Sequence, residues 1–80
     1  MAIEIVNAKA GLIEVIPFNE QPALINARMI AAVDRIDDDR SRITLLPAAS
    51  AQTGPKAYDV PDDYETVKDI VSAVFSTMVS

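Results

Sequence analysis

Two kinds of hydrophobic pattern divide this chain and limit what it can fold into. Across the first sixty residues the apolar residues come in short runs, several of which alternate with polar residues, whereas the last twenty repeat every three to four residues. Alternation with a period of two is typical of a strand with one buried face, and a repeat near 3.6 is typical of an amphipathic helix. The chain is therefore expected to form short strands followed by one helix.

The strand segments are bounded by turn-forming residues. In Ile3–Val6 the two isoleucines share one face and Glu4 lies on the other. Arg28–Ile36 is ambiguous, because its apolar residues also fit a helical period; its β-branched residues and its hairpin distance from the next segment favour a strand. The other segments with a strand pattern are Leu12–Phe18, Pro22–Asn26, Ser41–Leu46 and Ala57–Val60.

The expected fold class is α+β, with a small antiparallel β-sheet or partly open barrel of about four to five short strands covered by one C-terminal amphipathic helix. Residues 1–80 are expected to form a single domain, since a chain of 80 residues is close to the smallest size at which one core suffices. A hydrophobic fraction of 50% can supply that core, and a net charge of -5 is too modest for a disordered chain.

The stretch RIDDDRSRITLL places Asp37, Asp38 and Asp39 side by side. Three adjacent carboxylates can belong to a metal site, to an acid–base centre or to the tip of a hairpin. Aspartate bonds its own backbone in turns, whereas three consecutive residues of an extended chain point in different directions and do not converge on one ion. Flanking arginines also compensate much of the charge. The pattern therefore favours a turn over Asp37–Arg40 and disfavours a metal site.

The segment Pro47–Ala57 differs in composition from the rest of the chain, because it is small, polar and punctuated by Pro47, Gly54 and Pro55. It predicts an exposed loop over residues 47–57. Long loops often carry contacts with partners, but a tolerated insertion is the favoured interpretation here.

The segment PDDYETVKDIVSAVFSTMV predicts an amphipathic helix of about four turns. Asp62 and Glu65 have the spacing of a capping box, and the acids of the first turn suit the positive end of the helix dipole. We expect the apolar stripe to cover the sheet as a lid rather than to dock a partner helix. The stripe consists of Tyr64, Val67, Val71, Val74 and Met78, widened by Ile70 and Phe75.

Missing residue types exclude several chemistries. The chain has no Cys and no His, so it lacks thiolate nucleophiles, cysteine zinc sites and the usual base near neutral pH. Its two glycines, Gly11 and Gly54, cannot build a phosphate-binding loop. We therefore assign no catalytic, cofactor-binding or metal-binding residue and expect no cofactor. No apolar run approaches the roughly 20 residues of a membrane span, and MAIEIVNAKAG is unlike a signal peptide, so a cytoplasmic protein is expected.

The order PALINARMIAAVDRIDDDRSRITLL, then a loop, then YDVPDDYETVKDIV resembles the small flagellar FlbD-like family of bacteria, also known through swarming-motility proteins. The resemblance runs from Leu12 to Val74. It departs where Pro47–Ala57 replaces the family's Gly after a Thr-Leu strand, and the first eleven residues have no counterpart. It implies a small β-rich domain ending in a helix, without enzymatic activity and tied to motility. The motifs that match are Ile25-Asn26, Ile30 with Val33, Ile43-Thr44-Leu45, Val60, and Glu65 with Val67.

A protein-interaction module is the function class that the sequence favours. A small sheet presents unpaired edges, which a second copy or a partner strand can cover, so we expect a homo-oligomer or a protein partner. Nucleic-acid binding is disfavoured, because seven basic residues face twelve acidic ones and phosphate contacts dominate such affinity. The basic residues that could form a patch, interleaved with aspartates, are Arg28, Arg35, Arg40 and Arg42.

An enzyme is the third class considered. Paired carboxylates can hydrolyse glycosides, and Asp34, Asp59 or Asp62 could in principle pair across a cleft. A chain of this size has little material from which to wall a substrate pocket. Catalysis is therefore not expected.

Overall fold

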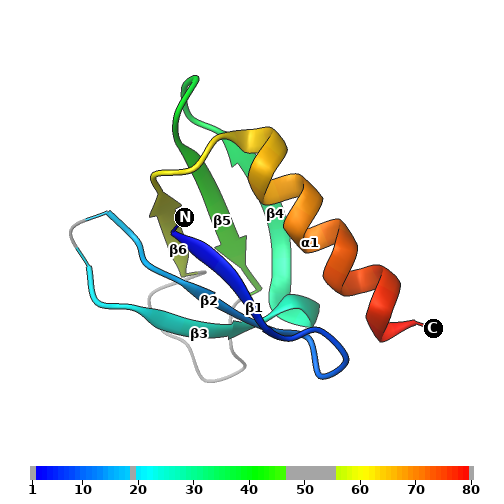
Figure 1. Ribbon diagram of the computed structural model, residues 1–80. Coiled ribbons are helices and arrows are strands. Elements are labelled where there is room, and N and C mark those ends of the chain that lie inside the picture. Colours follow the sequence, from blue (N-terminus) through cyan, green and yellow to red (C-terminus); the bar gives the residue numbers. More distant parts are fainter. Residues whose placement is uncertain (1, 19, 47–55, 80) are drawn as a thin grey trace.

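The computed structural model describes residues 2–18, 20–46 and 56–79. It shows strands followed by one C-terminal helix, which confirms the α+β class, and the strands in these residues number six rather than four to five (Figure 1). The strands are β1 (Ile3–Asn7), β2 (Leu12–Val15), β3 (Ala23–Asn26), β4 (Ile30–Arg35), β5 (Ser41–Leu45) and β6 (Ala57–Val60); the helices are a short 3-10 helix, η1 (Ala27–Met29), and α1 (Tyr64–Met78).

The strands form two antiparallel sheets. Sheet A has the order β1-β2-β3 and sheet B the order β4-β5-β6. The chain passes from one sheet to the other through η1. The helix α1 packs against η1 and against β1 and β4, which are one edge strand of each sheet. Near the other edge of sheet B, the amide of Phe18 donates to the carbonyl of Asp59 at 2.8 Å, so the segment after β2 meets β6.

One hydrophobic core joins both sheets and the helix. Buried positions alternate with more exposed ones in β2, as the sequence pattern predicts, whereas β1 buries only Ile3. The helix adds three buried valines. Burying each aliphatic side chain contributes about 1.5–3 kcal/mol. The helical stripe is therefore a lid on the core, as predicted. The buried apolar residues are Ile3, Ile13, Val15, Ile25, Ala27, Ile43, Val60, Val67, Val71 and Val74.

The predicted strand Leu12–Phe18 is shorter in the structure, where β2 ends at Val15. Pro17 has no backbone N–H to donate, which limits the pairing beyond this point. Residues 47–55 of the predicted loop lie outside the described residues. Ala57, which was expected at the end of that loop, begins β6.

The ambiguous segment Arg28–Ile36 contains both kinds of structure. Its first residues belong to η1, and extended structure begins at Ile30. The side-chain oxygen of Asn26 accepts a hydrogen bond from the amide of Arg28 at 2.9 Å and so caps the short helix. The prediction of one strand over the whole segment was therefore wrong at its start, where Arg28 and Met29 belong to η1.

The capping box predicted at Asp62 and Glu65 is also wrong, because the residue that precedes α1 is Asp63. Its carboxylate accepts a hydrogen bond from the hydroxyl of Thr66, which lowers the pKa of Asp63. The carboxylate of Asp62 instead accepts a hydrogen bond from the amide of Ala2 at 2.9 Å. Asp62 therefore ties the start of the chain to the start of the helix.

Candidate interaction surface

The three aspartates form the tip of the β4–β5 hairpin, at the end of the molecule that is uppermost in Figure 1. The amide of Asp39 donates to the Asp37 carboxylate at 2.9 Å, which is the aspartate turn that the sequence predicts. The amide of Ile36 donates to the carbonyl of Arg40 at 3.0 Å and closes the hairpin. The prediction of a turn is confirmed.

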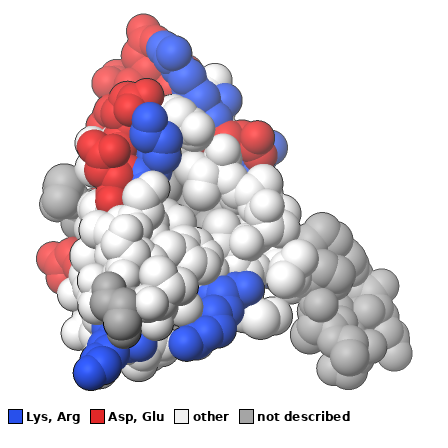
Figure 2. Space-filling model, turned by 90° about the vertical axis from the view of Figure 1, so that its right-hand side faces the viewer, with Lys and Arg blue, Asp and Glu red and all other residues white. Residues whose placement is uncertain are grey.

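Arginines neutralise two of these three acids. Arg40 lies 2.7 Å from the Asp37 carboxylate, and this hydrogen-bonded pair lowers the pKa of Asp37 and raises that of Arg40. Arg35 pairs with Asp38. Figure 2 shows charges of both signs gathered at this end of the molecule. Within the described ranges, no group of three or more His, Cys, Asp or Glu residues could hold a metal ion.

The carboxylates considered for catalysis point to structural partners instead. The register places Asp34, Arg42 and Asp59 side by side across sheet B. Arg42 lies 2.7 Å from Asp59, and the hydrogen bond lowers the pKa of that carboxyl. Asp62 binds the backbone of Ala2. The structure therefore does not bring Asp34, Asp59 and Asp62 together around one cavity.

The four arginines considered for nucleic acid are divided among local contacts. Arg35, Arg40 and Arg42 each pair with an aspartate, and Arg28 donates to the carbonyl of Ala10 at 3.3 Å. Acidic neighbours thus interrupt the basic surface, as the sequence indicates.

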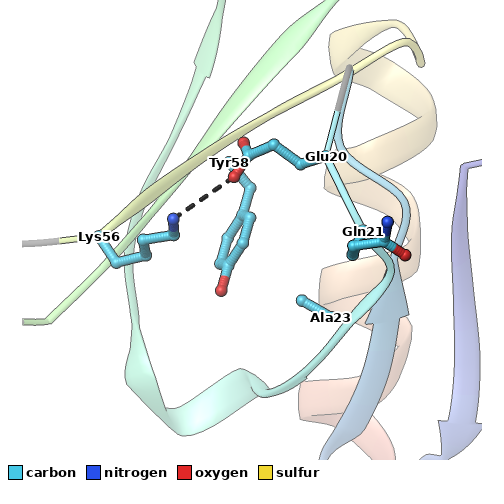
Figure 3. A pocket seen from close by; sticks show the side chains of 5 residues that line it. All are labelled: Glu20, Gln21, Ala23, Lys56 and Tyr58. Atoms are coloured by element: carbon cyan, nitrogen blue, oxygen red, sulfur yellow. Dashed lines mark hydrogen bonds and ion pairs between the residues drawn. The ribbon is translucent and has the colours of Figure 1, made fainter.

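A shallow hollow of about 530 Å³ lies between the chain that enters β3 and strand β6 (Figure 3). Lys56 and Glu20 meet there at 3.5 Å, and the Lys56 ammonium lies 5.1 Å from the centre of the Tyr58 ring. The two charged groups that line the hollow neutralise each other, so it offers no strong anchor for a charged ligand. Ala23 of β3 also lines it.

Sheet A presents a second face to the surroundings, which we call the outer face. On β2, Leu12 and Glu14 alternate with the buried Ile13 and Val15 and therefore point outward. The register places Asn7 and Asn26 beside Leu12, and it places Glu4 and Leu24 beside Glu14. Leu24 is 58% exposed. The outer face consists of the apolar Leu12, Ile16 and Leu24, the amides Asn7 and Asn26, and two acids, Glu4 and Glu14.

The two acids of the outer face lie directly opposite each other. Glu4 is the register partner of Glu14, and side chains so placed have Cβ atoms about 4.5–5.5 Å apart. Strands β1, β2 and β3 contain no Lys or Arg. Of the ion pairs found in the described part of the chain, none includes either acid. The outer face therefore combines apolar side chains with two uncompensated carboxylates.

Strand β3 is an edge strand with an outward-facing backbone. The amide of Ala27 donates to the carbonyl of Gly11 at 2.8 Å. These two residues continue the register of β2 and β3 by one position and form a hydrogen-bonded pair. Since hydrogen bonds alternate along an antiparallel ladder, Ala23 and Ile25 bond to β2 and the backbone of Leu24 faces away from it. The sequence of β3, ALIN, contains neither charge nor proline, the usual protections of an edge.

Comparisons of this chain with protein-family models, with curated proteins and with solved structures each find no match. The resemblance to the FlbD-like family therefore stays a prediction. In the part of the chain that the structure describes, no helix has both the length and the hydrophobicity to cross a membrane.

Sequence reasoning placed Glu4 and Glu14 on the polar sides of their strands but missed that they face each other. The signal that could have found this is the short connection from Asn7 to Leu12, because the length of a hairpin turn fixes the register of its strands. The bulge between Ile5 and Asn7 shifts that register by one residue, however, and a bulge is not evident from the sequence.

Proposed function

We propose that this chain is a small, non-enzymatic protein-interaction module that self-associates by pairing β3 of one copy with β3 of a second. The observation that carries the proposal is the outward-facing backbone of Leu24 on an uncharged edge strand. An unpaired strand edge is a template for another strand, and two identical edges pair about a twofold axis.

The other three edges are less suited to this pairing. Strands β1 and β4 contact α1 and carry charged residues. Strand β6 carries Asp59, whose carbonyl already accepts the amide of Phe18. Strand β3, in contrast, carries no charge, and among the strands of the described residues it pairs with β2 alone.

The strength of such pairing follows from its length. Strand β3 has four residues, and each hydrogen bond contributes a net of about 0.5–1.5 kcal/mol. The exposed Leu24 side chain adds apolar contact. Self-association is therefore expected to be reversible and concentration-dependent.

A substitution at Leu24 tests the edge directly. Leu24→Pro removes the outward amide while leaving the bonds of Ala23 and Ile25 to β2, and proline is tolerated on edge strands. By light scattering, we expect the wild-type mass to rise from monomer toward dimer with concentration and the Leu24→Pro mass to stay monomeric. Leu24→Val keeps the amide and should associate like the wild type.

A second variant separates loss of association from loss of the fold. Leu24→Lys places a charge on the edge without altering the backbone, and it too should remain monomeric while its circular dichroism spectrum is unchanged. A wild type that stays monomeric at the highest concentration, or a folded Leu24→Lys protein that dimerises as the wild type does, would contradict the proposal.

A role as an accessory or regulatory factor in bacterial motility, inside the cytoplasm, belongs to the same proposal and rests on the resemblance described above. It is supported by the shared order of strands, charged turn and helix. Deleting the gene and measuring swimming and swarming tests it: a motility defect restored by the wild-type gene is expected, and unimpaired motility would contradict it.

A further inference from the structure

The outer face of sheet A places acidic side chains next to apolar ones. Side chains on this face fall into three rows across the strands: Leu12 between Asn7 and Asn26, then Glu14 between Glu4 and Leu24, then Ile16. The two acids occupy the middle row. Along β2 and its continuation, Glu14 lies between Leu12 and Ile16, so the central line of the face reads apolar, acidic, apolar.

The acid pair is expected to lower the stability of the isolated domain slightly. Like charges directly opposite each other on neighbouring strands repel, and nothing in sheet A offsets the repulsion of Glu4 and Glu14, because its strands hold no basic residue. Departures from local rules that weaken a fold are expected at functional surfaces. A basic side chain bound between the two acids would remove the repulsion.

A second copy of this chain, docked by its own outer face, does not supply a positive charge to Glu4 and Glu14. Two outer faces packed about a twofold axis through the middle row would bring the two carboxylates of each copy together, four in all. Like charges at an interface disfavour the complex. Pairing through the β3 edge is different, because it leaves the outer face open.

We propose that the outer face docks an amphipathic helix of a partner protein that carries apolar, basic and apolar residues in succession along one side. The basic residue lies between Glu4 and Glu14, and its apolar neighbours pack on Leu12 and Ile16. This goes beyond self-association, since it uses a different surface and a different partner.

The dimensions of the face agree with this occupant. Successive rows are two residues apart along a strand, or about 6.8 Å, and residues four apart on a helix are separated by about 6 Å along its axis. A helix is about 10–12 Å wide, and three strands spaced about 4.8 Å apart present a surface of similar width. A helix aligned with the strands can therefore contact all three rows.

A defined peptide serves as the probe. It is a blocked amphipathic helix of about 15 residues with Leu, Lys and Leu at intervals of four on one side, and a matched peptide has Glu in place of each Lys. By fluorescence anisotropy we expect the Lys peptide to bind, more weakly as salt is added, and the Glu peptide not to bind. Equal binding of both peptides, or binding of neither, would overturn the proposal.

Neutralising the acids locates the site. Glu4→Gln with Glu14→Gln should raise the dissociation constant for the Lys peptide about tenfold or more. Asp39→Asn with Asp69→Asn removes the same net charge from the hairpin tip and from α1, and should leave it unchanged.

Loss of the fold cannot mimic this result. The Gln double variant is expected to melt at a higher temperature than the wild type, because the repulsion is gone. An unchanged dissociation constant in this variant, or an equal loss in the control variant, would show that the outer face is not the docking site.

Discussion

Gly11 lies where the β1–β2 turn meets the C-terminal end of α1. Gly11 ends the β1–β2 turn with a φ of +79°, in the left-handed region that other residues adopt at a cost. A Cβ at this position would lie 2.8 Å from the sulfur of Met78 and 3.3 Å from the side-chain oxygen of Asn26. The turn and the C-terminal end of α1 can approach this closely only because the side chain is absent.

Gly11→Ala is therefore expected to lower the free energy of unfolding by about 1–2 kcal/mol from backbone strain, and further because Met78 must move. Denaturant unfolding measures the sum. Combining Gly11→Ala with Met78→Ala separates the two causes: the double variant should lose less than the two single losses added together. A Gly11→Ala protein as stable as the wild type would contradict the left-handed conformation of Gly11.

At the scale of elements, α1 decides much of the stability. Its valines at positions 67, 71 and 74 are buried against both sheets, and a domain of this size has only a few kcal/mol of net stability. The opposite side of the helix is exposed, and there Lys68 pairs with Glu65 at 2.9 Å. The two sides should therefore respond very differently to substitution.

Val71→Ala should cost about 2 kcal/mol, the transfer free energy of two methyl groups plus a small cavity. Val71→Asp should unfold the chain, because the core offers a buried carboxylate no partner. Lys68→Ala, the control on the exposed side, should melt close to the wild type. Thermal melts followed by circular dichroism compare the three. A folded Val71→Asp protein would mean that the stripe does not cover the core.

At the scale of the whole molecule, the predictable features were those that depend on local periodicity. The stripe of α1 and the aspartate turn are set by residues within a few positions of each other, and both appear in the structure. The alternation in Ile3–Val6 predicted a strand, which is present as β1, but only Ile3 is buried and Ile5 is 42% exposed. The helix start was misplaced by one residue because Asp62 and Asp63 are equivalent as local signals. Only the distant amide of Ala2 distinguishes them.

The candidate surfaces depend on contacts that local patterns do not carry. The division into two sheets, the seating of α1 against β1 and β4, and the contact of Phe18 with Asp59 all bear on which edge is free. In the part of the chain that the structure describes, they leave β3 as the edge strand without such a contact. The meeting of Glu4 with Glu14 depends on a bulge in β1. Each joins residues that are distant in the sequence or shifts a register, so neither surface could be located from the sequence alone.

The exchange of backbone amide hydrogens at increasing protein concentration tests self-association through β3 most directly. In the monomer the amide of Leu24 faces away from β2, whereas that of Ala23 is bonded to it. We predict that exchange at Leu24 slows as concentration rises, because the amide becomes bonded to a second β3. The amide of Asp38 in the hairpin tip should exchange at one rate throughout. If the Leu24 amide exchanged at the same rate at every concentration, self-association through β3 would be contradicted.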